Sequence, residues 1–152
     1  MKWPPVLLLP FPISKELIEI FICSYNEPNG ISRQVDSLSA FIRAQHGLIS
    51  LKLALQLSAS DITCVLESIE SQHDTLRHLH ITSVNFFGVV PLRMIAKCYQ
   101  LRTITFSKCK SLTTNITEPL ISTTFPHLKK VNLRTSSCRE LSDWANVVNS
   151  KS

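Results

Sequence analysis

The stretch Leu101–Leu112 reads LRTITFSKCKSL. Its apolar residues Leu101, Ile104 and Phe106 are separated by polar ones, and Ile104 and Phe106 fall on one face of an extended strand because successive side chains point to opposite faces. Cys109 follows where this alternation ends, with no second cysteine at a spacing typical of a disulfide or a zinc site. The stretch therefore predicts a short strand with one buried face, followed by a lone cysteine.

The same apolar spacing, L-x-x-L-x-L, recurs along the chain. Its copies begin 31, 28, 25 and 27 positions apart, at Leu17, Leu48, Leu76, Leu101 and Leu128. One such triple is common by chance, but five in nearly even steps indicate internal repeats.

The segments between the copies carry the apolar spacing of helices. Ile62, Val65, Leu66 and Ile69 fall at i, i+3, i+4 and i+7, and Ser60 or Asp61 is placed to cap that helix. Comparable stripes lie in three other intervals: Val35, Leu38 and Ile42; Leu92, Ile95, Ala96 and Tyr99; Leu141, Trp144, Ala145 and Val148. Pro119 restricts the remaining helix to about residues 117–123. Each unit is thus a strand, a turn and a helix, which buries its apolar face only by stacking on its neighbours.

This pattern resembles the leucine-rich repeat family, L-x-x-L-x-L-x-x-N/C-x-L, over residues 17 to 148. The helix-bearing units and the cysteine in LRTITFSKCKSL are similar to the cysteine-containing and ribonuclease-inhibitor-like subclasses, which include the substrate-binding arrays of F-box proteins. The resemblance implies an α/β fold: a horseshoe segment of a solenoid with about five units, a concave parallel sheet and helices on the convex side. Residues 17–152 would form the array, and residues 1–16 a capping or irregular segment.

The resemblance also gives Cys109 a structural role. In such repeats the Asn or Cys side chain turns inward and hydrogen-bonds the loop backbone of the next unit. We therefore expect Cys109 to be buried and unreactive. Other units depart from the pattern, with Gln56, Val84 and Ser136 at the equivalent position.

Strand alternation assigns three rows of side chains to the concave side. Across the units these rows are Glu19, Ser50, His78, Thr103 and Lys130; Phe21, Lys52, His80, Thr105 and Asn132; and Cys23, Ala54, Thr82, Ser107 and Arg134. Residues 1–75 carry 5 Lys/Arg against 8 Asp/Glu, whereas residues 76–152 carry 11 against 3. An acidic segment of a protein is the partner such a surface suits, although lysines that only keep the face soluble explain it equally well. The candidate partner-binding residues are Arg77, His78, His80, Arg102, Thr103, Thr105, Lys130 and Arg134.

Other classes of function find less support. The basic rows contain no aromatic platform, which argues against nucleic acid. The sequence has no G-x-S-x-G elbow, no glycine-rich phosphate loop and no H-E-x-x-H. His78 and His80 share a strand face as two zinc ligands would, but the rows offer no third ligand nearby. We expect no enzyme activity, no metal and no cofactor.

Five scattered cysteines form neither a disulfide framework nor a zinc pattern. The opening MKWPPVLLLPFPIS imitates a signal peptide, but prolines interrupt its short apolar run and no cleavage site follows. No apolar run approaches the roughly 18 residues that cross a bilayer. A cytoplasmic or nuclear protein without a membrane partner is expected.

The sequence therefore predicts a non-enzymatic protein–protein recognition scaffold. The resemblance favours the substrate-recognition array of an F-box-type ubiquitin ligase component. LLLPFPISKELIEIF only faintly echoes an F-box, so we expect either a truncated gene product or a chain that has lost its link to the ligase. The alternative is an inhibitor or regulatory scaffold, similar to the ribonuclease-inhibitor group and unrelated to ubiquitin ligation.

Overall fold

The computed structural model describes residues 18–23, 31–135 and 138–151, with side chains from residue 35 onward. The predicted N-terminal segment (residues 1–16), Leu17 and Ser136 lie outside the described residues. Strands and helices alternate along the chain, which is an α/β structure. Their order is β1 (Ile18–Cys23), α1 (Ile31–Ala44), β2 (Ser50–Gln56), α2 (Ala59–Ile69), η2 (Glu70–Gln72), β3 (His78–Thr82), α3 (Arg93–Ala96), β4 (Thr103–Ser107), α4 (Thr114–Ser122), β5 (Lys130–Arg134) and α5 (Arg139–Ser150).

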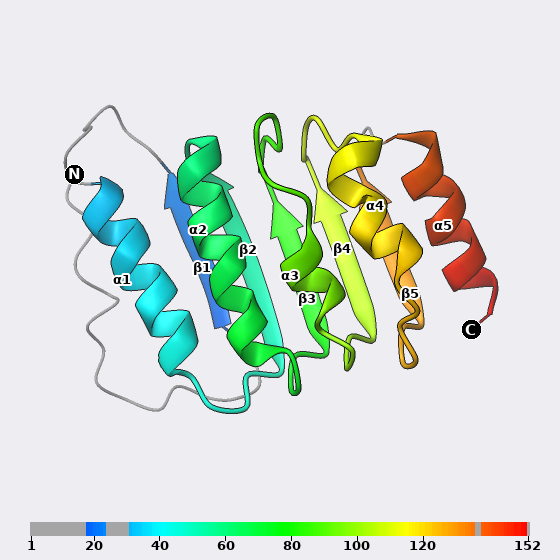
Figure 1. Cartoon of the computed structure of the whole chain (residues 1–152), viewed down its shortest axis with the longest axis horizontal. Coiled ribbons are helices and arrows are strands. Elements are labelled where there is room, and N and C mark those ends of the chain that lie inside the picture. Colours follow the sequence, from blue (N-terminus) through cyan, green and yellow to red (C-terminus); the bar gives the residue numbers. More distant parts are fainter. Residues whose placement is uncertain (1–17, 24–30, 136–137, 152) are drawn as a thin grey trace.

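The strands form one parallel sheet in the order of the sequence, β1-β2-β3-β4-β5. The helices lie on one side of this sheet (Figure 1). No described helix covers the other side, which we call the open face. Its residues on β2 to β5 are Ser50, Lys52, Ala54, His78, His80, Thr82, Thr103, Thr105, Ser107, Lys130, Asn132 and Arg134.

The predicted register is confirmed for four of the five strands. Ser50 pairs with His78, His78 with Thr103, and Thr103 with Lys130. The first step was predicted wrongly, because Glu19 pairs with Lys52 and not with Ser50. A slip of two residues leaves every side chain on its original face, so the apolar pattern does not distinguish the two registers.

The core lies between the sheet and the helices, where β2 to β5 contribute alternate apolar residues. Leu79, Ile81, Ile104 and Phe106 are fully buried, and Val131 nearly so. Leu133 was expected in this set but is only partly buried. It belongs to β5, which has no further strand beside it among the described residues.

Helix α2 follows the predicted apolar stripe, with Ile62, Val65, Leu66 and Ile69 buried. Its cap was assigned wrongly to Ser60 or Asp61. The N-cap is Ser58, whose hydroxyl oxygen accepts a hydrogen bond from the Asp61 N–H at 3.4 Å and donates to the Asp61 carboxylate at 2.9 Å. Ser58 thus satisfies an N–H that the first helical turn leaves without a partner.

Two helices differ from their predictions. Helix α3 spans only Arg93–Ala96, and Tyr99, placed on its buried stripe, is 45% exposed. This unit is the shortest, and residues 83–92 of it form a loop, so little chain remains for a helix. Helix α4 begins at Thr114 rather than near residue 117 and keeps Pro119 inside it. Pro119 lacks only the N–H of one helical hydrogen bond, and its ring is buried.

The units are joined by the same backbone contact at three successive boundaries. Just before a strand begins, one carbonyl oxygen accepts hydrogen bonds from two consecutive N–H groups of the next unit, at 2.7–3.1 Å. The acceptors are Ile49, Arg77 and Arg102; the donor pairs are Arg77 and His78, Arg102 and Thr103, and Lys129 and Lys130. Residues preceding neighbouring strands therefore stand next to each other.

Within the described residues, no helix combines the length and the apolar character needed to cross a bilayer.

Replacing Phe106 by alanine is expected to lower the free energy of unfolding by about 3–5 kcal/mol. Phe106 is 0% exposed, and its ring packs edge-on against Phe86 with centroids 6.0 Å apart. Urea unfolding measures the change. The matched control is Phe87→Ala, where the ring is 77% exposed and the expected change is below about 0.5 kcal/mol. Similar effects of the two substitutions would contradict this packing.

Candidate protein-binding face

The middle of the open face is a row of polar side chains that bond one another across strands. His78 Nδ1 lies 2.8 Å from Thr103 Oγ1, and His80 Nε2 lies 3.1 Å from Ser107 Oγ. The Asn132 amide donates to Thr105 Oγ1 at 3.3 Å. These contacts fix the side chains in place, so the face offers a pre-formed polar floor.

One end of this floor carries a row of cations. Arg77, Arg102 and Lys129 each stand one residue before a strand. The boundary bonds described above place their backbones side by side, at about the 4.8 Å spacing of neighbouring strands. Lys130 follows on β5, and all four are exposed. We call Arg77, Arg102, Lys129 and Lys130 the N-terminal basic row, because they lie where the strands begin.

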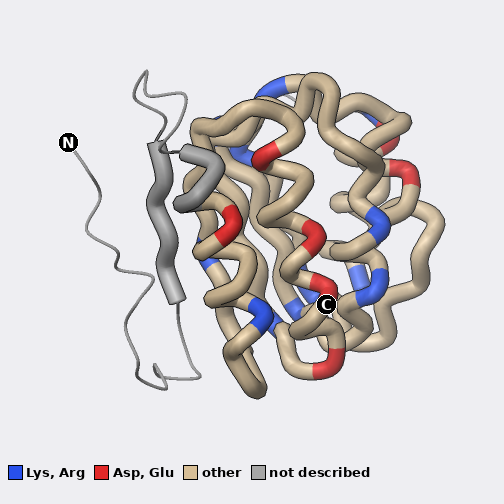
Figure 2. Tube along the Cα trace, turned by 60° about the vertical axis from the view of Figure 1, so that its left-hand side comes forward, with Lys and Arg blue, Asp and Glu red and all other residues tan. Residues whose placement is uncertain are grey.

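No residue of the N-terminal basic row forms an ion pair with a side chain in the part of the chain that the structure describes. The acidic residues are elsewhere: those with described side chains belong to helices, apart from Asp74 in the loop before β3. In Figure 2 most acidic positions lie along the helical turns of the tube. The ion pairs Lys97–Glu70 and Arg139–Asp143 join helical or helix-flanking residues. Among the described side chains, the helical side therefore carries both signs of charge, whereas the open face carries cations only.

These positive charges affect the pKa of His78. Its pKa is lowered from the ordinary value of 6.5, first by burial and then by the charges of Arg102 and Arg77. The neutral imidazole is consequently the form present near neutral pH, and a bound anion would favour the protonated form.

The structure brings together five of the eight predicted binding residues. Arg77, Arg102 and Lys130 lie at the N-terminal end with His78 and Thr103, while His80 and Thr105 lie in the middle of the floor. Arg134 does not converge with them. It ends β5, four residues from Lys130, which is roughly 13 Å along an extended strand.

Sequence reasoning did not single out the loops at the carboxyl ends of the strands. Phe87, Lys108 and Lys110 are all exposed there. The one available signal was the doublet Phe86-Phe87 after β3, because a turn that buries one ring tends to expose its neighbour.

Cys109 is buried, with 3% of its surface exposed. Its thiol donates to the carbonyl oxygens of Ser107 at 3.3 Å and Ile81 at 3.5 Å. The contact thus runs to the preceding unit, not to the following one as the resemblance implied. Contact with the following unit comes from Thr135, whose hydroxyl donates to the Cys109 carbonyl. Burial raises the pKa of the thiol, partly offset by backbone hydrogen bonds from Val84 and Ser107.

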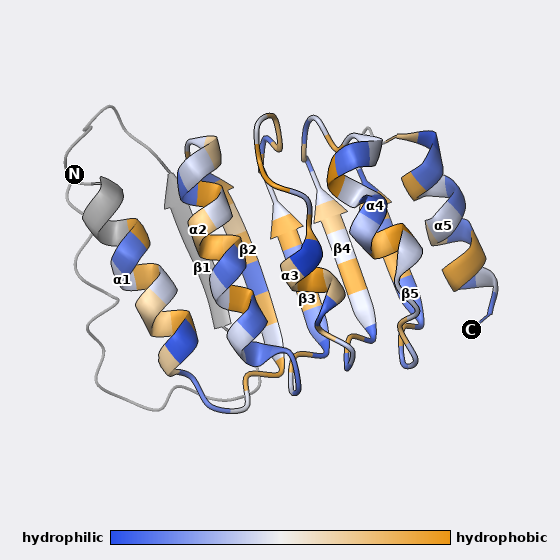
Figure 3. Cartoon of the chain, viewed as in Figure 1, coloured by the Kyte–Doolittle hydropathy of each residue, from blue (hydrophilic) through white to orange (hydrophobic). Residues whose placement is uncertain are grey.

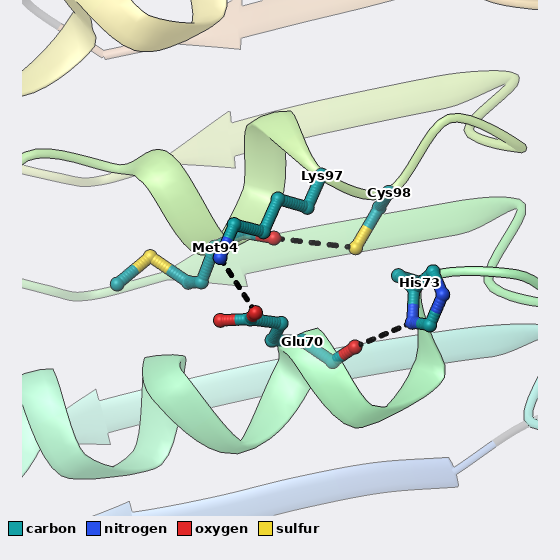
Figure 4. A network of polar contacts seen from close by, with 5 residues as sticks. All are labelled: Glu70, His73, Met94, Lys97 and Cys98. Carbon is teal, nitrogen blue, oxygen red and sulfur yellow. Dashed lines mark hydrogen bonds and ion pairs between the residues drawn. The ribbon is translucent and has the colours of Figure 1, made fainter.

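A second polar cluster lies on the helical side, where it links η2 to the end of α3 (Figure 4). Lys97 Nζ lies 2.6 Å from Glu70 Oε1, and His73 Nδ1 lies 3.0 Å from the Glu70 carbonyl oxygen. The Cys98 thiol donates to the Met94 carbonyl at 3.5 Å, and burial, followed by the Glu70 charge, raises its pKa to about 12. Such a thiol is a poor nucleophile, and the contacts of this cluster join two units.

The described residues contain no group of three or more His, Cys, Asp and Glu side chains arranged to hold a metal ion. His78 and His80, the pair considered as zinc ligands, bond to hydroxyl groups of β4 instead.

No family profile, curated protein or solved structure matches this chain significantly. What the protein does must therefore be inferred from the geometry of its own residues.

In the native protein, Cys109 and Cys98 are expected to resist a thiol-alkylating reagent at pH 7.5, because burial keeps both thiols protonated and inaccessible. Cys64 and Cys138 are partly exposed and serve as internal controls. Mass spectrometry of digested protein locates the labels. Labelling of Cys109 as fast as Cys64 would contradict the structural role.

The substitution Arg102→Gln is expected to raise the pKa of His78 towards 6.5, because it removes a positive charge that disfavours the imidazolium. NMR titration of the histidine ring protons measures the change. Arg93→Gln, on the helical side, is the control and should leave the titration of His78 unchanged.

Proposed function

We propose that this protein is a non-enzymatic scaffold of the leucine-rich-repeat type that binds an acidic segment of another protein on its open face. The observation that carries the proposal is the N-terminal basic row, four exposed cations beside a polar sheet face, without acidic partners among the described residues. A cation row of this kind supplies charge-assisted hydrogen bonds to carboxylates or phosphates.

Several features support the repeat type. Three strand-to-strand steps keep one register, and the paired N–H contact to a single carbonyl recurs at the same place in each. Ser83 and Lys108 follow β3 and β4 at equivalent positions, and both adopt a positive φ, 60° and 52°. The buried thiol of Cys109 bonds backbone in two units, its own and the preceding one, although the resemblance implied the following unit.

The arrangement of charge favours a bound anion over simple solubility. Like charges on adjacent strands repel and destabilise a sheet. A soluble surface needs no such alignment, since mixed charges serve as well. An acidic segment lying across Arg77, Arg102 and Lys129 would neutralise all three and remove the repulsion.

Within this class, the first candidate is the substrate-recognition array of an F-box-type ubiquitin ligase, and an inhibitor or regulatory scaffold is the alternative. Affinity capture from cell lysate, scored by mass spectrometry for cullin-type ligase subunits, separates the two. Ligase subunits recovered in stoichiometric amounts support the first candidate. A stoichiometric partner without them assigns the regulatory role.

The open face is tested by the double substitution Arg102→Glu with Lys130→Glu, which is expected to weaken capture of the partner tenfold or more and leave the fold intact. Both side chains are exposed, so the core is not disturbed. The matched control is Arg93→Glu with Lys151→Glu, which changes net charge equally at two exposed positions of the helical side. Equal losses in both double variants would show that only net charge matters.

Salt and pH should act on the same interaction. Binding is expected to weaken as salt rises past about 0.1 M, where the screening length falls below about 10 Å. Binding should tighten as pH falls below 6.5, because the lowered pKa of His78 leaves it neutral in the free protein and a bound anion raises that pKa. Capture that is unchanged in the Arg102→Glu/Lys130→Glu variant, in salt and at low pH would refute the proposal.

A further inference from the structure

The loop after β3 exposes a large aromatic ring. Phe87 is 77% exposed, and nearby Val90 is 41% exposed. In Figure 3 the loop above β3 carries mainly hydrophobic residues. We call residues 85–90 the Phe87 turn. A single exposed apolar side chain is normal on a protein surface, so the significance of Phe87 depends on its surroundings.

The Phe87 turn is held rigidly. Asn85 Oδ1 accepts a hydrogen bond from the Phe87 N–H at 3.1 Å, and the Val89 N–H donates to the Phe86 carbonyl at 3.0 Å. Phe86 and Val89, on either side of the exposed ring, are buried. Gly88 has φ +79°, and a Cβ added there would lie 3.4 Å from Ala59 Cβ at the start of α2. Phe87 is thus held outward by a turn that is anchored on both sides.

Cations flank this turn along the carboxyl ends of the strands. Asn85 pairs with Lys110 in a parallel bridge, and the Lys110 carbonyl accepts the Phe86 N–H at 2.9 Å. Next along the edge, the Lys108 N–H donates to the Arg134 carbonyl at 3.2 Å. We call Lys110, Lys108 and Arg134 the C-terminal basic row. Residues 75–117 contain six Lys or Arg and no Asp or Glu, so nothing within this sequence segment neutralises Lys108 or Lys110.

We infer that the Phe87 turn and the C-terminal basic row form a second contact for the partner, one that takes a large apolar side chain next to acidic residues. This inference rests on the proposed function, since it extends the same partner across the open face. An exposed aromatic ring on a hydrogen-bonded turn, beside cations, is the arrangement of a binding hot spot, because the backbone that carries the ring is already ordered before binding.

The distance between the two basic rows sets the length of the bound segment. Arg77 and Ser83 mark the two ends of β3 and are six residues apart, or roughly 20 Å in an extended strand. An extended peptide covers that distance in about six residues. In the partner segment, the acidic residues that contact the N-terminal basic row should therefore lie about five to seven positions away from the large apolar residue that contacts Phe87.

A protein segment fits this site better than a membrane surface does. One aromatic ring and one valine bury too little apolar area to hold a bilayer, for which even a whole acyl chain is marginal. The same area is sufficient for one anchor residue in a protein interface.

Selection from a library of random 16-residue peptides displayed on phage tests the inference with the intact chain. Enriched peptides are synthesised, and their affinities are measured for the wild type and for Phe87→Ala, Lys108→Glu/Lys110→Glu and Arg102→Glu/Lys130→Glu. Val147→Ala is the control for loss of an exposed apolar side chain, because Val147 is 52% exposed on α5. Vesicles of phosphatidylserine and phosphatidylcholine are assayed in parallel.

The expected result is a set of peptides with acidic residues and one large apolar residue at the stated spacing. Their affinity should fall at least tenfold for Phe87→Ala and for Lys108→Glu/Lys110→Glu, and less than twofold for Val147→Ala. Replacing the apolar residue of a peptide by alanine should abolish the effect of Phe87→Ala.

The outcomes separate this inference from the proposed function. Peptides that lose affinity for Arg102→Glu/Lys130→Glu but not for Phe87→Ala overturn the inference and leave the open face as the binding site. Peptides sensitive only to Phe87→Ala and Lys108→Glu/Lys110→Glu support binding at the Phe87 turn, contradict the proposed function, and overturn the extension of one segment across the open face. No enrichment over an unrelated control protein overturns both. Vesicle binding that depends on Phe87, without peptide binding, would assign the turn to a membrane and overturn the inference.

Discussion

The structure depends on one constraint: consecutive strands pair in parallel and in register, so that residues at the same position of successive units stand side by side. Because side chains alternate along a strand, the apolar positions stack into a continuous core on the helical side of the sheet, and the polar positions stack into rows on the other. Leu79, Ile104 and Val131 are neighbours for the same reason that His78, Thr103 and Lys130 are. The same register therefore determines which apolar residues stack in the core and which polar residues line up on the open face, so a change in register would alter both.

The constraint also determines how charge is distributed. A helix can bring an acidic residue near a basic one by their spacing in the sequence, as with Arg139 and Asp143. Across parallel strands, in contrast, the neighbours are the residues at the same position of successive units, whatever their charge. Arg77, Arg102 and Lys129 occupy one position in three units and therefore repel one another. Such repulsion costs stability, and the proposed binding of an anion would offset this cost. Burial, and then the charges of Arg102 and Arg77, lower the pKa of His78, so this row of cations contributes to that shift.

The parts of this structure that the sequence predicts are those that the register controls. The L-x-x-L-x-L spacing predicts β2 to β5, their pairing and the burial of Phe106. Alternation with a period of two places the apolar residues of each strand on one face, and that face has to be buried. It does not fix the pairing of β1, since a slip of two keeps every face. Nor does it predict Ser58 as a cap, the shortness of α3 or the exposure of Tyr99, which depend on how many residues the loops use. Among the candidate binding residues, the register predicts that Arg77, Arg102 and Lys130 come together. Phe87 was missed because a turn, and not a strand, determines where its side chain points.

Cys109 connects the register to the second basic row. It stands between Lys108 and Lys110, and of these three residues it alone is buried. Its thiol bonds the carbonyls of Ser107 and Ile81, so the loop is fastened to its own strand and to the preceding one. With the middle residue held inward and Lys108 at φ 52°, the two lysines on either side are directed to solvent. A larger side chain at position 109 would release this loop, and a smaller one would leave its backbone bonds unsatisfied. The lone cysteine thus needs no reactive role: a small buried donor at this point is what holds the lysines beside Phe87 in a fixed position.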